Sequence, residues 1–128
     1  MAIYEYQYVS ITTYTKDGSE KNCPVWIVGL DNKELGFTTD STSWKVRRIS
    51  HTPRVELRPC DSRGNVVEGT EVVSGFARLV SGHEFQTVHD AVKAKYGFQF
   101  SLIVFLGGIK NFFRKVSSSS CGVIITVD

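Results

Sequence analysis

Residues 4–28 read YEYQYVSITTYTKDGSEKNCPVWIV, two stretches rich in β-branched and aromatic residues on either side of the turn sequence Lys-Asp-Gly-Ser. Such residues are enriched in strands, and an Asp-Gly pair favours a tight hairpin. The sequence therefore predicts a strand over residues 4–14 that turns back at residues 16–19. The chain then returns as a second strand over residues 24–28.

Further short strands follow along the chain. Strand propensity and turn signals predict them over residues 34–39, 54–59, 66–80 and 122–127, and the third of these is long enough to bend at Gly69 or Gly75. Six strands need their sheet edges closed or covered. The fold class predicted from this pattern is mainly β, a barrel or sandwich with accessory helices.

Two helices are expected between the strands. Asp40 or Ser41 can cap a helix that runs to about Ser50, and Ser81 can cap another that ends at Tyr96 before Gly97. In the second helix Glu84 stands at the third position, as in a capping box. Residues 98–115 are mostly apolar and suit either a buried strand or a helix. We favour the helix there.

Composition limits the classes of function. The 128 residues suit one domain spanning residues 1–128, and a net charge of +2 is too balanced for a nucleic-acid-binding module. The three cysteines form no CxxC pair, so neither a metal site nor a disulfide framework is expected. Residues 1–8 lack a secretory signal pattern, and the apolar run over residues 98–113 is too short and interrupted for a membrane span. We therefore expect a cytoplasmic protein without a membrane partner.

One segment, TTDSTSWKVRRI over residues 38–49, combines features that can bind an anion. It runs from the end of a strand into a basic helix, where free backbone N–H groups and the positive end of the helix dipole meet hydroxyls and cations. The alternative is that the hydroxyls only cap the helix and the cations only face water. No hydrolase or nucleotide-loop motif accompanies this segment, so the catalytic residues are unknown. This segment is the candidate phosphate seat, in which Lys45 and Arg48 lie three residues apart on one helix face with Ser41.

Short pieces of the sequence, in order and spacing, resemble the pyridoxamine 5′-phosphate oxidase-like split-barrel proteins, which bind FMN or coenzyme F420. The resemblance is greatest to their actinobacterial F420-dependent oxidoreductases. It covers nearly the whole chain. The matching pieces are residues 8–13, 16–18, 24–26, 38–40, 43–49, 53–55, 59–61 with Gly64, 75–79 and 95–97.

This resemblance implies a six-stranded, FMN-binding-like split barrel of Greek-key type that forms a homodimer, with the cofactor in a groove at the interface. The strand Pro24, Val25 and Trp26 would line the ring system. Thr38, Thr39, Ser43, Lys45 and, less directly, Arg48 would correspond to the phosphate end, so the two lines of reasoning meet at the same segment.

The function implied by the resemblance is F420H2-dependent hydride transfer from the deazaflavin to an organic acceptor, quinone-like or tetrapyrrole-like. A cofactor that carries the hydride chemistry requires of the protein mainly position and charge. The acidic tail of F420 would be attracted by Arg47, Arg54 and Arg58. The alternatives are an FMN-binding oxidoreductase of the same fold, or a non-catalytic carrier of F420, flavin or haem.

Overall fold

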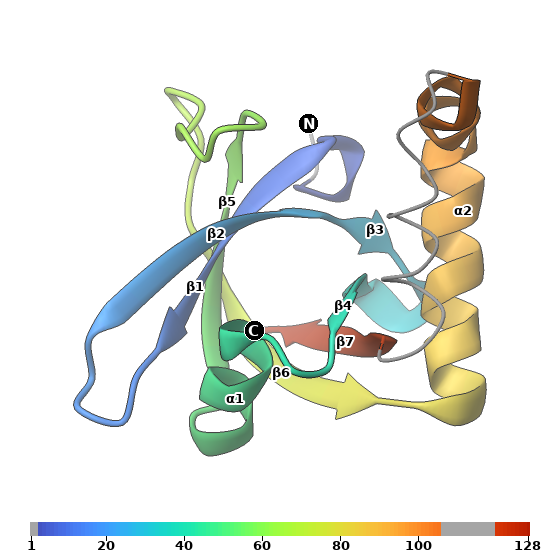
Figure 1. Cartoon of the computed structure of the whole chain (residues 1–128). Coiled ribbons are helices and arrows are strands. Elements are labelled where there is room, and N and C mark those ends of the chain that lie inside the picture. Colours follow the sequence, from blue (N-terminus) through green and yellow to red (C-terminus); the bar gives the residue numbers. More distant parts are fainter. Residues whose placement is uncertain (1–2, 106–119) are drawn as a thin grey trace.

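The computed structural model describes residues 3–105 and 120–128, and its centre is one antiparallel sheet. The sheet has seven strands in the order β2-β1-β5-β6-β7-β4-β3 (Figure 1). The strands are β1 (Tyr8–Tyr14), β2 (Glu20–Trp26), β3 (Val28–Gly29), β4 (Glu34–Asp40), β5 (Arg54–Cys60), β6 (Val73–Val80) and β7 (Ser120–Val127). The helices are α1 (Trp44–His51) and α2 (Gly82–Phe105), with 3-10 turns η1 (Ile3–Glu5) and η2 (Asp31–Lys33).

The sheet curls so that its two end strands are joined through one residue. Strands β2 and β3 lie at opposite ends of the strand order, yet only Ile27 separates them in the chain. Figure 1 shows β2 arching over the sheet into β3. The expected single strand over residues 24–28 is thus broken, and the six-strand prediction is wrong. The break has a physical cause, because the Ile27 carbonyl accepts hydrogen bonds from Lys95 and Tyr96 of α2.

The first hairpin forms with its turn at residues 16–19, as the sequence predicts. Tyr14 pairs with Glu20, and Gly18 takes a φ of 88°, which an L-residue with a side chain rarely adopts. The Thr15 hydroxyl and the backbone N–H of Ser19 donate to the Asp17 carboxylate. These bonds lower the pKa of Asp17 to about 2. The strand before the turn is shorter than expected, since it begins at Tyr8.

Both helices differ from the predicted ranges. The N-cap position of helix α1 is Ser43 rather than Asp40 or Ser41, and the Asp40 carboxylate instead accepts hydrogen bonds from the backbone N–H and hydroxyl of Thr42. Helix α2 continues through Gly97 to Phe105. A glycine inside a helix costs only about 1 kcal/mol relative to alanine, and no proline follows to stop the helix. Within the expected helix over residues 98–115, residues 98–105 are helical and residues 106–115 lie outside the described residues.

The expected strand over residues 66–80 is also shorter. Its first part is a loop held by one isolated bridge between Cys60 and Val66, and ladder pairing starts only at Val73. Asp61 forms the preceding turn by accepting hydrogen bonds from the backbone N–H groups of Arg63 and Asn65. Among the described residues, no helix is long and apolar enough to cross a membrane.

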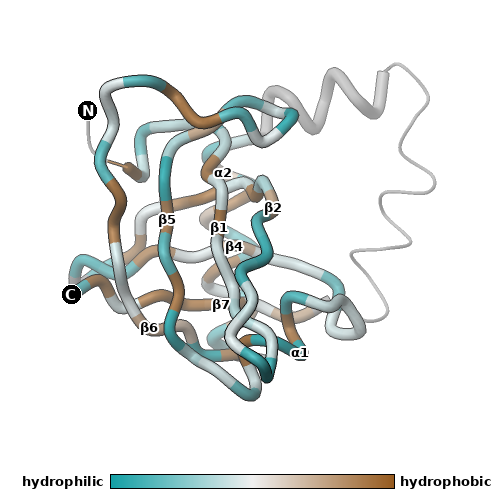
Figure 2. Tube along the Cα trace, turned by 90° about the vertical axis from the view of Figure 1, so that its left-hand side faces the viewer, coloured by the Kyte–Doolittle hydropathy of each residue, from teal (hydrophilic) through white to brown (hydrophobic). Residues whose placement is uncertain are grey.

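Two apolar clusters stabilise the fold. The inner faces of the strands and Ile49 of α1 fill the barrel, with Phe37, Ile11, Leu57 and Ile125 fully buried. A second cluster lies where α2 covers β3, β4 and β7, and it contains Val28, Val80, Val88, Val92, Tyr96 and Ile124. Strand β5 shows the alternation that produces such faces, with hydrophobic and hydrophilic residues in turn (Figure 2).

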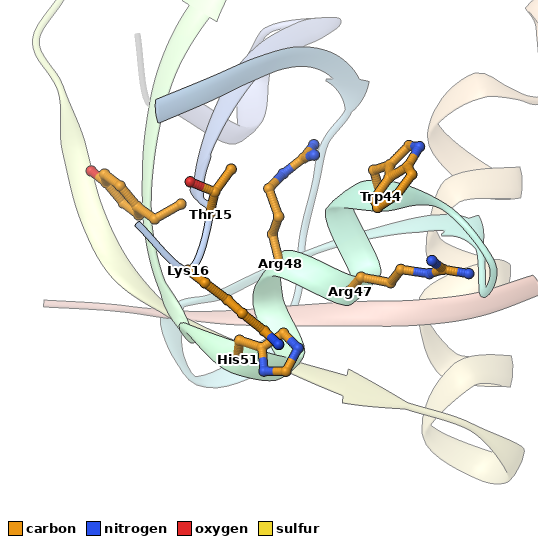
Figure 3. Close-up of a pocket in the computed structure, with 7 residues that line it drawn as sticks. Thr15, Lys16, Trp44, Arg47, Arg48 and His51 are labelled. Atoms are coloured by element: carbon orange, nitrogen blue, oxygen red, sulfur yellow. The ribbon is translucent and has the colours of Figure 1, made fainter. Parts of the chain in front are cut away.

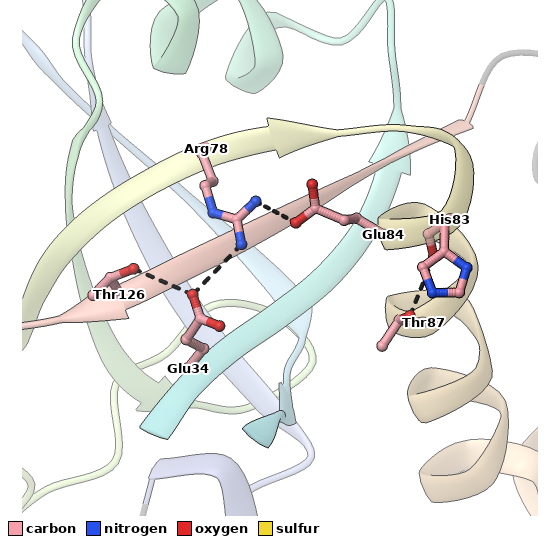
Figure 4. Close-up of polar contacts among 6 residues, drawn as sticks. All are labelled: Glu34, Arg78, His83, Glu84, Thr87 and Thr126. Carbon is pink, nitrogen blue, oxygen red and sulfur yellow. Dashed lines mark hydrogen bonds and ion pairs between the residues drawn. The ribbon is translucent and has the colours of Figure 1, made fainter. Parts of the chain in front are cut away.

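An ionic contact ties the start of α2 to the outer face of the sheet. Arg78 on β6 lies 2.5 Å from the Glu84 carboxylate of α2 and 3.6 Å from the Glu34 carboxylate of β4 (Figure 4). Glu84, which the sequence suggested for a capping box, therefore pairs with Arg78. All three side chains are partly exposed, so the contribution of each pair to stability is small.

Gly75 provides a test of the sheet geometry. A Cβ atom at this position would lie 2.5 Å from the backbone oxygen of Thr126 and 3.1 Å from Cγ2 of Ile125. Because the backbone of β7 cannot move away without breaking its ladder, we expect Gly75→Ala to lower the free energy of unfolding by about 1–3 kcal/mol. Urea denaturation measures this, with Ser74→Ala as the neighbouring control. A loss no larger than the control would contradict the close packing of β6 on β7.

Candidate functional site

The first part of the candidate site is the start of α1, where a buried hydroxyl lacks a partner. Ser43 is the N-cap residue, yet its side chain makes no capping hydrogen bond. Within the described part of the chain, Ser43 Oγ is a buried polar atom without any hydrogen-bond partner. The first N–H groups of an α-helix have no intrahelical acceptor either. An unpartnered hydroxyl and free amides therefore lie together at the positive end of the helix dipole.

The end of β4 lies beside this helix start. Thr38 pairs with Gly122 and Thr39 pairs with Cys121 on β7, so both threonines are fixed in the ladder. Burial raises the pKa of the Cys121 thiol, the Asp40 carboxylate raises it further, and the Lys45 ammonium lowers it. Lys45 is thus near enough to the strand ends to influence Cys121. Sequence reasoning missed this cysteine, because no local motif surrounds it.

The second part of the site is a pocket of about 320 Å³ between the β1–β2 hairpin and α1. Lys16, Arg47 and Arg48 bring three cationic side chains to it. Figure 3 shows Thr15 and Lys16 on the hairpin side and the remaining labelled residues on α1. The residues that line it are Tyr14, Thr15, Lys16, Trp44, Arg47, Arg48 and His51.

Arg48 and Trp44 give this pocket a fixed positive charge and an aromatic surface. The Arg48 Nε donates to the Thr13 hydroxyl at 2.7 Å, and Thr13 is 1% exposed, so the base of the guanidinium is fixed against β1. Trp44 is 69% exposed and the Arg47 guanidinium lies 4.9 Å from its ring centre. The pocket therefore presents both charge and an open aromatic surface to a ligand.

Sequence reasoning found Arg48 but not the hairpin half of the pocket. Tyr14, Thr15 and Lys16 precede α1 by about thirty positions, and no short motif links the two segments. Burial and the Glu56 carboxylate raise the pKa of Tyr14, so this wall of the pocket keeps its phenol proton. Of the residues expected to hold a phosphate, Ser43 and Lys45 lie at the α1 start, Thr38 and Thr39 lie near the end of β4, and Arg48 lines the adjacent pocket.

The strand expected to line a cofactor ring lies apart from that pocket. Val25 points into the barrel core and is 8% exposed, whereas Pro24 and Trp26 point to the opposite face. The Trp26 ring stacks on Tyr96 of α2, with ring centres 4.6 Å apart and planes at 20°. None of the three residues lines the pocket between the hairpin and α1.

The arrangement at the α1 start fits the phosphate group of a flavin or deazaflavin cofactor. Phosphate oxygens accept hydrogen bonds from hydroxyls and helix N–H groups, and charge-assisted bonds to Lys or Arg are the strong ones. The partnerless Ser43 hydroxyl is the observation that favours such a ligand, because buried polar atoms are ordinarily satisfied. Ser43 and Lys45 would hold the phosphate, with Arg48 adding charge from the pocket side. Thr38 and Thr39 are successive residues of β4 whose side chains point to opposite faces, so only one of the two hydroxyls can face the same phosphate.

Ser43→Ala separates a binding role from a capping role. Loss of an N-cap hydroxyl ordinarily costs about 1 kcal/mol of stability. Because Ser43 makes no capping bond, we expect the ligand-free variant to stay within about 0.5 kcal/mol of the wild type and cofactor binding to weaken by about 1 kcal/mol. Urea denaturation and calorimetry measure the two quantities. Ser50→Ala, at the far end of α1, is the control, and a capping-sized stability loss with unchanged binding would contradict the assignment.

Comparison with known proteins gives structural likeness only. No protein-family profile matches the sequence, and no curated protein matches it. A solved F420 reductase matches with a TM-score of 0.59 and 16% identity over 98% of this chain and 90% of its own. A pyridoxamine 5′-phosphate oxidase-related, FMN-binding protein from Nostoc punctiforme matches with a TM-score of 0.60 and 19% identity over 98% and 73%.

A third solved structure, a haem-binding protein from Mycobacterium smegmatis, has a TM-score of 0.63 and 13% identity over 96% of this chain. This chain spans 47% of the length of that protein. At these identities the matches show the fold and leave the ligand of this chain open. The chain has the split-barrel fold of the pyridoxamine 5′-phosphate oxidase-like proteins.

Proposed function

We propose that this chain is an F420H2-dependent oxidoreductase that transfers a hydride from the deazaflavin to a quinone-like or tetrapyrrole-like acceptor. The observation that carries the proposal is the buried, partnerless Ser43 hydroxyl at the start of a helix whose other polar residues include Lys45 and Arg48. This arrangement supports a phosphate-bearing ligand. A split-barrel fold shared with F420- and FMN-binding proteins supports the redox class of that ligand.

The cofactor would supply the hydride chemistry, and the protein would supply position and charge. Ser43 and the free N–H groups of α1 donate hydrogen bonds to the phosphate, and Lys45 balances its charge. Arg48, fixed by its bond to Thr13, keeps positive charge on the side of α1 that faces the hairpin. No side chain of the described residues needs to be a nucleophile or a metal ligand in this scheme.

F420 is preferred over FMN because of the charge around the pocket. Its tail carries several carboxylates, and Lys16, Arg47 and Arg48 line the pocket next to the phosphate seat. Exposed charges are screened beyond about 8–10 Å at physiological salt, so only cations close to the tail contribute strongly. The preference for F420 should therefore shrink as ionic strength rises.

A homodimer is part of the proposal, with the cofactor groove shared between two copies. The pocket is open on one side, and Trp44 at its rim is 69% exposed, which suits a residue covered by a partner. Light scattering at micromolar concentration tests this. Cofactor binding by a monomer would contradict a groove shared between two copies.

Turnover is the test of the enzymatic proposal. The purified protein is titrated with F420 and FMN and then assayed with the reduced form of each against quinones and linear tetrapyrroles. We expect tighter binding of F420 and acceptor-dependent oxidation of F420H2. Tighter binding of FMN would favour the flavin enzyme, whereas saturable binding without oxidation by any acceptor would favour a carrier.

A further inference from the structure

Two side chains of α2 hold the residue at which the barrel closes. The Lys95 Nζ donates to the carbonyl oxygens of Tyr4, Tyr6 and Ile27 at 2.6, 2.7 and 2.6 Å. The Tyr96 hydroxyl lies 2.7 Å from the Ile27 oxygen and 2.8 Å from the Gln7 oxygen, so its one proton is shared between them. The carbonyl of Ile27 is therefore fixed twice, by neighbouring residues of one helix.

The same helix also fixes the side chain just before Ile27. The Trp26 ring stacks on the Tyr96 ring. The Tyr8 ring also meets Trp26, edge-on, with ring centres 6.3 Å apart. Tyr96 is 3% exposed, and burial raises the pKa of its phenol, which keeps the proton needed for donation. Burial lowers the pKa of Lys95, and the three groups to which its ammonium donates are neutral carbonyls.

These contacts matter because β2 is at one end of the sheet. In the part of the chain that the structure describes, β1 is the strand that pairs with it in the sheet. Beyond Trp26 the chain leaves β1 and crosses to β3, and Ile27 is the only residue between the two strands. The contacts that α2 makes with Trp26 and with Ile27 therefore help to set the orientation of the Trp26 ring.

We propose that Lys95 and Tyr96 are positioning residues that fix Trp26 and the end of β2 for contact with the cofactor ring. This inference rests on the proposed function and on the family resemblance, which implies that Pro24, Val25 and Trp26 line the cofactor ring. In this arrangement α2 positions the residues that contact the cofactor ring, and α1 binds the phosphate. Loss of either side chain should then loosen the hold on the ring and leave phosphate binding intact.

The test compares Lys95→Met and Tyr96→Phe with Lys93→Met, an exposed lysine of the same helix. Lys95→Met keeps the apolar stem and loses the ammonium, and Tyr96→Phe keeps the stacked ring and loses the hydroxyl. Calorimetry measures the affinity for F420 and FMN. Amide chemical shifts of α1 measure the affinity for inorganic phosphate, which occupies only the phosphate seat.

We expect Lys95→Met to lower cofactor affinity about tenfold with phosphate affinity unchanged, and Lys93→Met to alter neither. Tyr96→Phe should act in the same direction, and it provides the test if Lys95→Met does not fold. Equal losses for cofactor and phosphate would indicate a general structural role and overturn the inference. Unchanged cofactor affinity in both variants would also overturn it, without affecting the proposed function. A wild type that binds neither cofactor would overturn the proposed function and the ring-end role together.

Discussion

Lys45→Ala is expected to weaken cofactor binding by about 1.5–3 kcal/mol, the range for hydrogen bonds to charged groups, which is roughly ten- to 150-fold in Kd. Lys45 is the cation next to the Ser43 N-cap, and its charge already acts on Cys121 across from Thr39. A phosphate dianion at the α1 start would interact with it strongly, because the bond is charge-assisted.

Calorimetry of Lys45→Ala with F420 and FMN measures the loss, and Lys93→Ala on α2 is the control for removing a lysine elsewhere. Circular dichroism of both variants checks that they fold. Full affinity in a folded Lys45→Ala protein would remove Lys45 from the site. Restoration of part of the affinity by Lys45→Arg would instead support a charge contact.

Phe37→Ala is expected to lower the free energy of unfolding by about 3–5 kcal/mol, the cost of deleting a large buried aromatic side chain. Phe37 is 0% exposed in the barrel core and directly precedes Thr38 on β4. Its loss leaves a cavity below the strand that carries the phosphate seat. The effect on cofactor affinity should therefore follow the loss of stability rather than exceed it.

Phe76→Ala is the matched control for this experiment, because Phe76 is 51% exposed on the outer face of β6. The Arg54 guanidinium carbon lies 5.1 Å from the centre of the Phe76 ring. We therefore expect Phe76→Ala to lower the free energy of unfolding by about 0.5–1 kcal/mol. Urea denaturation of both variants gives the comparison. Similar losses for the two phenylalanines would contradict the assignment of Phe37 to the core.

Local signals account for what the sequence predicted correctly. The Asp17-Gly18 pair specifies the hairpin by itself, because Gly18 takes the positive φ and Asp17 accepts the bonds of the turn. The candidate phosphate seat was proposed in the same way, since Thr38 to Arg48 are contiguous and carry hydroxyls, a helix start and cations together, and its role stays a prediction.

The errors come from contacts between distant residues. The break at Ile27 depends on Lys95 and Tyr96, 68 and 69 positions away, so no window of sequence around residues 24–28 contains its cause. Gly97 was expected to end a helix that continues for eight more residues, since a lone glycine weakens a helix without stopping it. The hairpin half of the pocket was missed because only the fold brings Tyr14 and Lys16 beside α1.

Backbone amide chemical shifts of the wild-type protein, followed during titration with F420, test most directly whether a phosphorylated redox cofactor binds at the α1 start. We expect saturable shifts concentrated in residues 38–48, with a second group at the end of β2, and the loss of the first group in Ser43→Ala and Lys45→Ala at the same ligand concentration. Saturable binding of F420 with no shifts over residues 38–48 would contradict this expectation, as would the absence of binding by both F420 and FMN.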